Sequence, residues 1–329
     1  MRTRKNPLMG SGVSMIDYTR LDAALRAGGL IPGDIEAGRL VRCKVDGDRG
    51  GKKSGAYLLF DDDLPTCLWW HWKAGTSGVW GNLDRPLTDA ERNRQRQRIE
   101  QAQRERHAEQ SARWADNRVK LARLWGSAQT VTPSSAAGLY LVNRGLAIPV
   151  TDALRFHPRL DYWHDGAMIG SYPAMLGAVT SPAGDLVAVH RTYLTDDGHK
   201  APVPAVKKLT ETAGPLAGAS IKISEPAPRP DGLLGLGVAE GIETAMAASI
   251  LSGVPVWSCV SAHGLKSFNP PPRVRSLYVF GDRDESGVGQ KAAAALAGRA
   301  AAAGLVARVL LPDAVGDWAD ELVAWRAAV

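Results

Sequence analysis

The sequence predicts a multidomain protein of the α/β and α+β classes, and three observations support this. Short strand-like runs, separated by Gly and Asp clusters, occupy residues 39–81, and a long charged helix is predicted over about residues 89–126. From residue 231 onward, apolar strands alternate with helical segments, as in a doubly wound α/β domain. We therefore divide the chain into a small β-rich module, a basic helical linker, a subdomain with an antiparallel sheet and a C-terminal α/β domain, over residues 1–84, 85–126, 127–230 and 231–329.

The composition is that of a globular protein without a membrane segment. Hydrophobic residues make up 45% of the 329 positions, no run of about 18 apolar residues occurs, and the N-terminus MRTRKNPLMGSG lacks an apolar signal core. The three cysteines, Cys43, Cys67 and Cys259, are too few and too scattered for a disulfide framework. We therefore expect a cytoplasmic protein with reduced thiols.

Aromatic and basic residues lie close together in the predicted β-rich module, which holds Trp69, Trp70, Trp72 and Trp80 together with Lys44, Lys52, Lys53 and Lys73. Rings beside cations can stack on the bases of a single-stranded nucleic acid. Alternatively, the tryptophans form the core of the module, with some rings on each side of the sheet. Zinc is not expected there, because Cys43, Cys67 and His71 are the only plausible ligands and a structural zinc normally takes four.

A capping box opens the long helix, since Thr88 and Glu91 have the spacing at which each side chain satisfies a free amide of the first turn. Apolar residues such as Leu121 and Trp125 recur at helical spacing near its end, so we expect this half to dock and the first half, rich in Arg, Gln and Glu, to be solvated. Eleven Lys or Arg against six Asp or Glu within residues 85–123 give this segment +5 of the chain's net +6. That charge marks either a solvated helix face or a track for phosphates.

Further elements are predicted on both sides of residue 231. Turn signals at Pro182–Asp185 and Asp196–Gly198 predict two hairpins of an antiparallel sheet. In the C-terminal domain, the two strands at Leu233–Ala239 and Ser276–Gly281 are followed by a third buried strand at Leu305–Leu311. This arrangement fixes where the acidic residues of the domain should lie.

Two of these predicted strands end in acidic residues. Glu240 follows the first strand, and Asp282 and Asp284 follow the second. Because the carboxyl ends of parallel strands form the ligand crevice of an α/β sheet, these acids should converge although 42 positions separate Glu240 from Asp282. Clustered carboxylates repel one another unless a hard cation lies among them. The sequence therefore predicts a magnesium site at this edge of the sheet.

The motif pair formed by Glu240–Gly241 and Asp282–Gly287 resembles that of the Toprim domain, which bacterial-type primases, topoisomerases and some nucleases share. Three further strings are YLVNRGL at residues 140–146, RTYL at 191–194 and DGHKAP at 197–202. Together with EGIETA and DRDESG, they make residues 35–329 resemble the Toprim-containing primase-like proteins of phages, plasmids and other mobile elements. The resemblance implies a Toprim domain at the C-terminus, a primase-type core subdomain before it and, at the N-terminus, a module in the place of a zinc ribbon that has lost its metal.

The resemblance also implies an activity, the synthesis of short primers on single-stranded DNA from nucleoside triphosphates with Mg²⁺ or Mn²⁺. It assigns catalysis to Glu240, Asp282 and Asp284, and it assigns the metal to the same residues and Asp317. Asp317 could instead cap the last helix, and Glu240 is either a metal ligand or the proton acceptor. Template or nucleotide phosphates are assigned to five basic residues, Arg144, Arg191, Lys200, Lys207 and Lys208. Unwinding is left to a separate replicative helicase.

Two other functions stay open. One is a Toprim phosphodiesterase that cuts or rejoins DNA, as nucleases and topoisomerases do, and the other is a non-catalytic accessory protein of replication that binds single-stranded nucleic acid. A topoisomerase needs a nucleophilic tyrosine, and nothing in the sequence marks a tyrosine for that role. The intact carboxylate set favours catalysis over the accessory role, because clustered acids are electrostatically costly.

Overall fold

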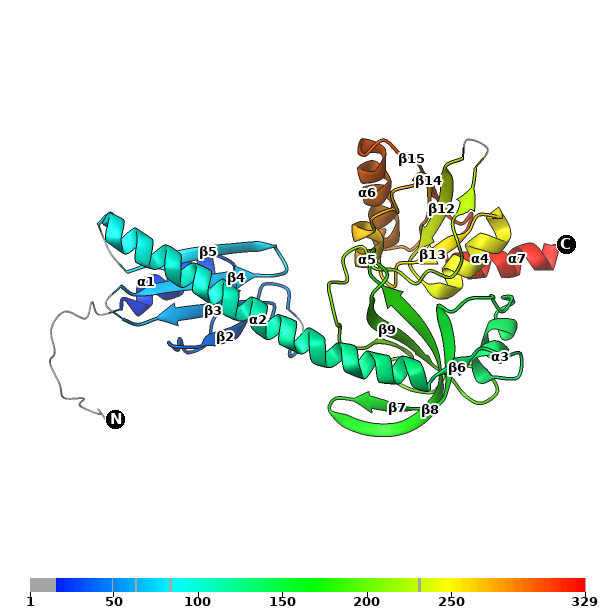
Figure 1. Cartoon of the computed structure of the whole chain (residues 1–329), viewed down its shortest axis with the longest axis horizontal. Helices are drawn as coiled ribbons and strands as arrows, with labels where there is room; N and C mark the ends of the chain where they lie inside the picture. Colours follow the sequence, from blue (N-terminus) through cyan, green and yellow to red (C-terminus); the bar gives the residue numbers. More distant parts are fainter. Residues whose placement is uncertain (1–15, 49, 63, 83–84, 230–231, 329) are drawn as a thin grey trace. The chain divides into compact units, whose positions relative to one another are not determined.

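The computed structural model describes residues 16–48, 50–62, 64–82, 85–229 and 232–328, and the chain divides into two compact units between Glu109 and Gln110. Both units mix helices with β-sheets, which confirms the predicted fold class (Figure 1). No helix in the described part of the chain is long and apolar enough to cross a membrane.

The first unit contains an antiparallel sheet whose strands follow one another in sequence order, β1 (Leu30–Ile31), β2 (Leu40–Val45), β3 (Gly55–Phe60), β4 (Thr66–His71) and β5 (Thr76–Gly81). The strand-like pattern of residues 39–81 is thereby confirmed. Helix α1 (Tyr18–Ala27) covers one face of the sheet, where Leu21 and Leu25 are fully buried against Tyr57 and Leu59. Burial of these side chains is the main force that holds the module together.

Helix α2 (Asp89–Ser127) begins with the predicted capping box, in which the Thr88 amide donates to Glu91 Oε2 at 2.8 Å. Its second half docks as expected, since Leu121 is only 3% exposed. Most of the first half is exposed, as expected, but one face of it packs on the first unit. Arg98 forms an ion pair with Asp62 at 2.5 Å, and Ala102 is 5% exposed.

The contact between α2 and the other face of the first-unit sheet, away from α1, explains why the sequence did not predict this docking. The Arg106 guanidinium lies 4.2 Å from the centroid of the Trp70 ring. Arginine covers an aromatic face with its planar head and apolar stem, so a helix can dock through arginines without any apolar stripe. A search for hydrophobic periodicity does not detect this kind of contact.

The second unit begins with the end of α2, which is followed by an antiparallel sheet in the order β10-β9-β8-β7-β6 and a helix, α3 (Ala136–Asn143). The strands are β6 (Gln129–Thr130), β7 (Leu154–His164), β8 (Ala167–Thr180), β9 (Leu186–Tyr193) and β10 (Lys207–Leu209). Both predicted turns are present, because the Ser181 amide donates to the Asp185 carbonyl and the Thr195 amide to the His199 carbonyl, each at 2.8 Å.

The C-terminal domain has a mostly parallel sheet between two helical layers. Its elements are β11 (Ala227–Pro228), β12 (Leu234–Ala239), α4 (Ile242–Ser252), β13 (Val256–Ser258), α5 (Ala262–Ser267), β14 (Val274–Phe280), α6 (Val288–Ala302), β15 (Val306–Leu310) and α7 (Trp318–Ala328). Strand β12 pairs in parallel with β13 and β14, and β14 pairs in parallel with β15. Helices α5 and α6 cover one face and α4 and α7 the other (Figure 1), which is the doubly wound arrangement that we predicted.

Strand β15 differs from its prediction. In the part of the chain that the structure describes, it lies at the edge of the sheet, and Val306 and Val309 are 56% and 37% exposed. The expectation of a buried strand is therefore wrong, because an apolar run does not tell an edge strand from a central one.

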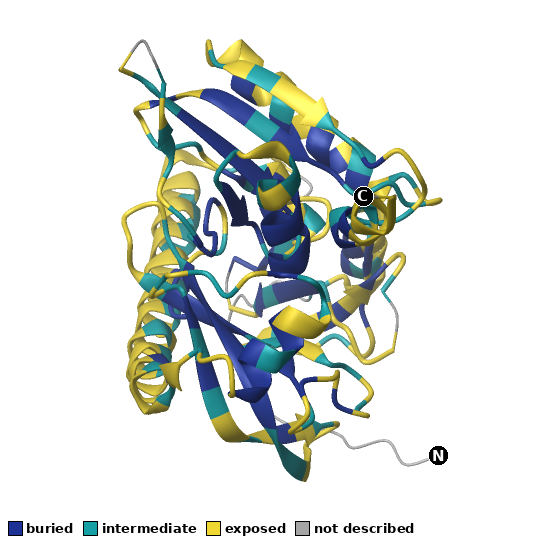
Figure 2. Ribbon diagram, turned by 90° about the vertical axis from the view of Figure 1, so that its right-hand side faces the viewer, coloured by how far each residue is buried: buried dark blue, intermediate teal, exposed yellow. Residues whose placement is uncertain are grey.

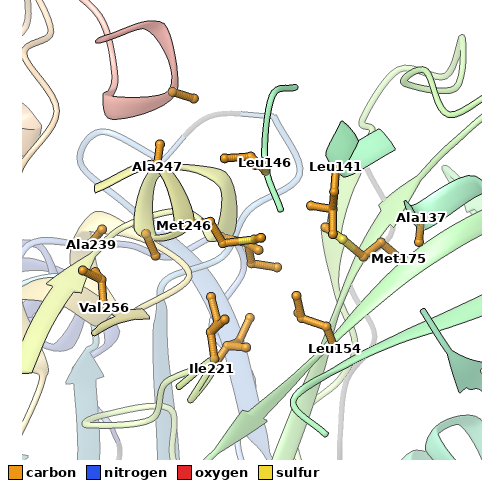
Figure 3. Packing of buried hydrophobic residues seen from close by; sticks show 14 of the residues in the cluster. Ala137, Leu141, Leu146, Leu154, Met175, Ile221, Ala239, Met246, Ala247 and Val256 are labelled. Atoms are coloured by element: carbon orange, nitrogen blue, oxygen red, sulfur yellow. The ribbon is translucent and has the colours of Figure 1, made fainter. Parts of the chain in front are cut away.

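A buried cluster joins the antiparallel sheet to the C-terminal domain. It includes Leu141 of α3, Met175 of β8, Met246 of α4 and Ile221, which precedes β11 (Figure 3). Buried positions line the strands on both sides of this contact (Figure 2). The two parts of the second unit consequently share one core, which holds their functional side chains in a fixed relation.

Candidate active site

The predicted acids lie at the carboxyl ends of β12 and β14. These two strands pair in parallel with Ala239 opposite Phe280, so Glu240 and Gly281 continue from neighbouring strand ends. Asp282 follows directly. The strand-end rule thus brings the two motifs together, as the sequence predicts.

Asp282 is held in a desolvated position among other acids. Burial, and then the charges of Asp317, Glu240 and Asp284, raise its pKa to about 7. Its Oδ1 atom is buried and has no hydrogen-bond partner among the described residues. An unpaired buried carboxylate oxygen is costly, because the lost hydration is not replaced. A cation bound at this oxygen would compensate for the lost hydration.

Glu240 belongs to the same acidic group. Burial raises its pKa, as does the charge of Asp284, while a hydrogen bond from the Ala262 amide and the charge of Lys207 act in the opposite direction. A raised pKa makes the carboxylate of Glu240 a stronger base than an ordinary glutamate.

Asp284 has a structural task at the start of helix α6. Its carboxylate accepts hydrogen bonds from the Ser286 hydroxyl at 2.5 Å and from the Gly289 amide at 2.9 Å. These bonds lower its pKa to about 2. A Cβ atom at position 289 would lie 3.0 Å from the Asp282 carbonyl oxygen, so a larger residue there would require this turn to shift.

Asp317 caps the last helix, as one of the two predictions has it, and it also lies near the other acids. Its Oδ1 accepts from the amides of Ala319 at 2.8 Å and Asp320 at 3.0 Å, so it caps helix α7. Its charge is also the second cause, after burial, of the raised pKa of Asp282. The cap therefore holds a carboxylate beside the acidic group.

Sequence reasoning missed a buried acid, Glu243, in the first turn of α4. It is 2% exposed and accepts hydrogen bonds from the Tyr140 hydroxyl at 2.6 Å and from Lys207 Nζ at 2.8 Å. Burial opposes its ionisation, but the charge and hydrogen bond of Lys207 and the hydrogen bond of Tyr140 outweigh this and lower its pKa to about 2. A glutamate inside the otherwise uncharged and mostly apolar string IETAMAASI was the available signal.

The five predicted basic residues do not gather in one place. Lys207 lies beside the acids, and Arg144 ends α3 close enough to Tyr140 for its charge to oppose the rise in the tyrosine pKa. Lys200 is exposed at the second hairpin.

Arg191 and Lys208 face away from the acids. They pair with each other across β9 and β10, where Arg191 Nη2 donates to the Leu209 carbonyl at 3.0 Å and Lys208 lies over the Tyr162 ring. Successive side chains of a strand point to opposite faces, so the Lys207 ammonium points toward Glu243 whereas the Lys208 ammonium lies at Tyr162.

The side chains of the acidic group are chemically suited to a divalent cation, but the described residues do not form a complete set of ligands. Among the described residues, no three Cys, His, Asp or Glu side chains stand close enough together to coordinate one ion. Asp282 nevertheless offers an unpaired oxygen in an acidic environment, and carboxylate oxygens are the ligands that Mg²⁺ prefers.

The first unit contains a basic cavity of about 750 Å³. Its lining includes Trp72 and four cations, Arg42, Lys52, Lys53 and Lys73, against one acid, Asp48. The carboxylate of Asp48 accepts from the amides of Val45 and Ser54 and from the Ser54 hydroxyl, which lower its pKa to about 2. Asp48 is therefore ionised, and the four cations outnumber this one acid in the lining.

The tryptophans of the first unit lie on both faces of the sheet, as one of the two predictions has it, since Trp69 packs against the core under α1 and the next residue of β4, Trp70, meets Arg106. Trp80 belongs to the buried core under α1, whereas Trp72 is 39% exposed, with the Arg42 guanidinium 4.0 Å from its ring centroid. Cys43 and Cys67 are buried in that same core, and desolvation raises the pKa of Cys67 to about 12. Their thiols therefore pack as apolar groups.

Comparisons with known proteins identify parts of the second unit. A family model described as a Toprim domain matches residues 235–326, and one described as a domain of unknown function (DUF7146) matches residues 115–222. The chain thus carries a Toprim domain, which confirms the resemblance seen in the Glu240 and Asp282 motifs. No curated protein matches the chain.

Similar solved structures are primase domains. They include a DNA primase domain from Pseudomonas aeruginosa, with 15% identity, 59% of this chain and 70% of that chain covered and a TM-score of 0.38. The primase fragment of the bacteriophage T7 primase-helicase protein has 16% identity, coverage of 61% and 71% and a TM-score of 0.36. The RNA polymerase domain of Mycobacterium tuberculosis primase DnaG has 19% identity, coverage of 66% and 82% and a TM-score of 0.39. At this level of similarity, the function of the chain has to be argued from its own residues.

Proposed function

We propose that this protein is a metal-dependent nucleotidyltransferase of the DNA primase type, which joins nucleoside triphosphates into short oligonucleotides on single-stranded DNA. The observation that carries the proposal is the acidic group at the ends of β12 and β14, with the unpaired buried oxygen of Asp282. In this proposal, the protein acts in the cytoplasm, in the replication of a phage, plasmid or other mobile element. A separate helicase would unwind the DNA.

The residues of the site suit the chemistry of phosphoryl transfer. When bound, Mg²⁺ or Mn²⁺ would lower the pKa of the attacking 3′-hydroxyl and neutralise charge on the leaving pyrophosphate. Asp282 would hold the ion together with Asp284 and Asp317, whose caps fix their orientation. Glu240 would accept the proton, and Lys207 would place a positive charge beside the phosphates.

A topoisomerase-like reaction is disfavoured by the tyrosine at this site. Tyr140 is 2% exposed and donates its hydroxyl hydrogen bond to Glu243, and burial raises its pKa. A buried phenol with a raised pKa is a poor nucleophile. Hydrolysis of DNA needs the same metal ion as synthesis, so an assay has to separate these two reactions.

We expect the purified protein to convert labelled nucleoside triphosphates into short oligonucleotides on single-stranded DNA with Mg²⁺ or Mn²⁺, without degrading the template. Glu240→Gln should lower this rate by about 10²- to 10⁴-fold, because the proton acceptor is lost. Gel analysis of the labelled products measures both reactions at once. Template cleavage without synthesis would favour the nuclease, and binding with neither activity would favour the accessory protein.

The basic cavity of the first unit should contribute to binding of single-stranded DNA. For the double variant Lys52→Ala and Lys53→Ala, we expect weaker binding and a salt slope shallower by about 0.7 for each phosphate that is no longer neutralised, because fewer counterions are released. Fluorescence anisotropy at several salt concentrations measures both quantities.

The control for this experiment is Lys44→Ala, an exposed lysine on β2 that does not line the cavity. Removing the whole N-terminal part up to Ser127 would be a poor test, because it would also remove Leu121 from the core of the second unit. Equal affinity and slope in the double variant and the native protein would show that these lysines are not part of the nucleic-acid surface.

A further inference from the structure

A second cavity, of about 300 Å³, lies in the second unit beside the acidic group. Strands β8 to β10 form one side of it, and the loop between β13 and α5 forms the other. Its walls are mostly apolar, and they include Val179, Leu209, Leu216 and Ala219. Small-molecule sites have this character, with apolar walls and a few polar groups that fix the orientation of the ligand.

His190 is the buried polar residue of this cavity, whose lining also includes Lys207, Lys208, Ser261 and His263. It is 8% exposed, and its Nδ1 atom is buried without a hydrogen-bond partner among the described residues. Burial lowers its pKa to about 4, so the imidazole is neutral at physiological pH. A neutral imidazole has one donor and one acceptor nitrogen, and His190 lines the cavity.

The loop that forms the opposite wall has a strained backbone. Val260, which lines the cavity, has a φ of 71°, in the left-handed region that a β-branched residue rarely adopts. Strain of this kind persists where the surroundings impose it, and it is concentrated at ligand sites. Its position gives a second, independent sign that this cavity is built for a ligand.

Lys207 connects the cavity to the acidic group. It lines the cavity, and its Nζ atom lies 2.8 Å from Glu243 Oε2. Its charge also acts on Glu240 and Asp282. A ligand with a flat ring in the cavity would therefore extend any anionic tail toward Lys207 and the acids.

We propose that this cavity binds the base of a nucleotide, with the ring between the apolar walls, a hydrogen bond from the base edge to His190 and the phosphates directed toward Lys207. The inference rests on the proposed function, because it assigns a base subsite to the same reaction. A nucleobase matches the cavity in three respects, since it is flat, largely apolar on its faces and rich in donors and acceptors at its edge.

The test uses adenosine, guanosine, cytidine and uridine with the full chain, because nucleosides lack phosphates and do not depend on a metal ion. Saturation-transfer NMR should detect binding of at least one nucleoside. Leu216→Trp, which fills the cavity from a partly exposed wall, should abolish the signal, and His190→Phe should weaken binding at least about fivefold, the loss of one hydrogen bond to a neutral partner.

Two control variants match these changes elsewhere in the second unit. Val323→Trp adds the same bulk on the exposed side of α7, and His157→Phe removes a histidine whose buried Nδ1 also lacks a partner among the described residues. Neither residue lines the cavity, so both variants should bind the nucleoside as the native protein does. If none of the four nucleosides binds, or if binding is unchanged in both cavity variants, the inference is overturned.

A measurement on the native protein covers the case in which a cavity variant does not fold. The imidazole resonances of His190 should shift when the nucleoside is added, and unchanged resonances would overturn the inference. Failure of the inference is also separable from failure of the proposed function. Nucleoside binding without oligonucleotide synthesis would refute the function alone, whereas normal synthesis with an unchanged KM in Leu216→Trp would refute the base subsite alone.

Discussion

Asp282→Asn is expected to lower metal-dependent oligonucleotide synthesis by about 10²- to 10⁴-fold while leaving the fold intact. The variant keeps the size of the side chain but removes the charge that would bind the cation, and Asp282 is the acid with the unpaired buried oxygen. The rate of synthesis as a function of Mg²⁺ concentration measures this effect. Asp313→Asn, at an exposed aspartate before α7, is the control and should retain native activity. Native Mg²⁺ dependence in the Asp282 variant would remove Asp282 from the metal site.

The same variant has a readout that needs no activity. In the native protein, the pKa of Asp282 is raised from 3.8 to about 7, so the folded state binds more protons than the unfolded state between these values. Its contribution to the free energy of unfolding therefore falls as pH rises through this window, and it is least favourable above pH 7.

Asp282→Asn should consequently stabilise the metal-free protein at pH 8, by about 1–2 kcal/mol after allowance for partial exposure, and should have little effect at pH 4. Mg²⁺ should raise the Tm of the native protein and not that of the variant. Thermal unfolding with and without chelator measures both shifts. A variant that is less stable than the native protein at pH 8 would show that the acids do not repel one another.

Lys207→Met is expected to destabilise the second unit by about 2–3 kcal/mol, because it leaves the carboxylate of Glu243 buried without its cation. This value lies below the range for a fully buried pair, since the Lys207 side chain is 43% exposed. Lys200→Met, at an exposed lysine, should change stability by less than about 0.5 kcal/mol. Denaturant unfolding of the two variants gives this comparison directly.

Adding Glu243→Gln to Lys207→Met should restore part of the lost stability, because the amide can keep the hydrogen bond from Tyr140 without a buried charge. The pH dependence has a defined sign. The pKa of Glu243 is lowered from 4.5 to about 2, so the pair stabilises the native protein above pH 4.5 and this contribution is lost as pH falls toward 2. A double variant no more stable than Lys207→Met would show that Glu243 does not depend on Lys207.

Several features of the fold and the site could be predicted because they follow from local patterns. Apolar strands that end in acids are visible in the sequence, and parallel pairing then places Glu240 beside Asp282. The capping box and the two hairpin turns follow from residues at fixed short spacing. These predictions needed no knowledge of how distant segments pack.

Other features could not be predicted, because they depend on which face of an element is covered. The first half of α2 docks through Arg98 and Arg106, whose contacts with Asp62 and Trp70 have no hydrophobic signature. Lys208 was grouped with Lys207, but their places on β10 point them to opposite faces.

The sequence by itself determined the class of the C-terminal domain and the acids of its crevice, since strand order and strand ends are encoded in short runs of residues. The tertiary structure alone decided which charges act together. Glu243 meets Tyr140, 103 positions away, and Lys207, 36 positions away, and His190 faces a cavity that is closed by the loop at Val260. Burial sets the strength of these interactions and the pKa values of the groups, and burial is a property of the packed chain, which short-range spacing does not contain.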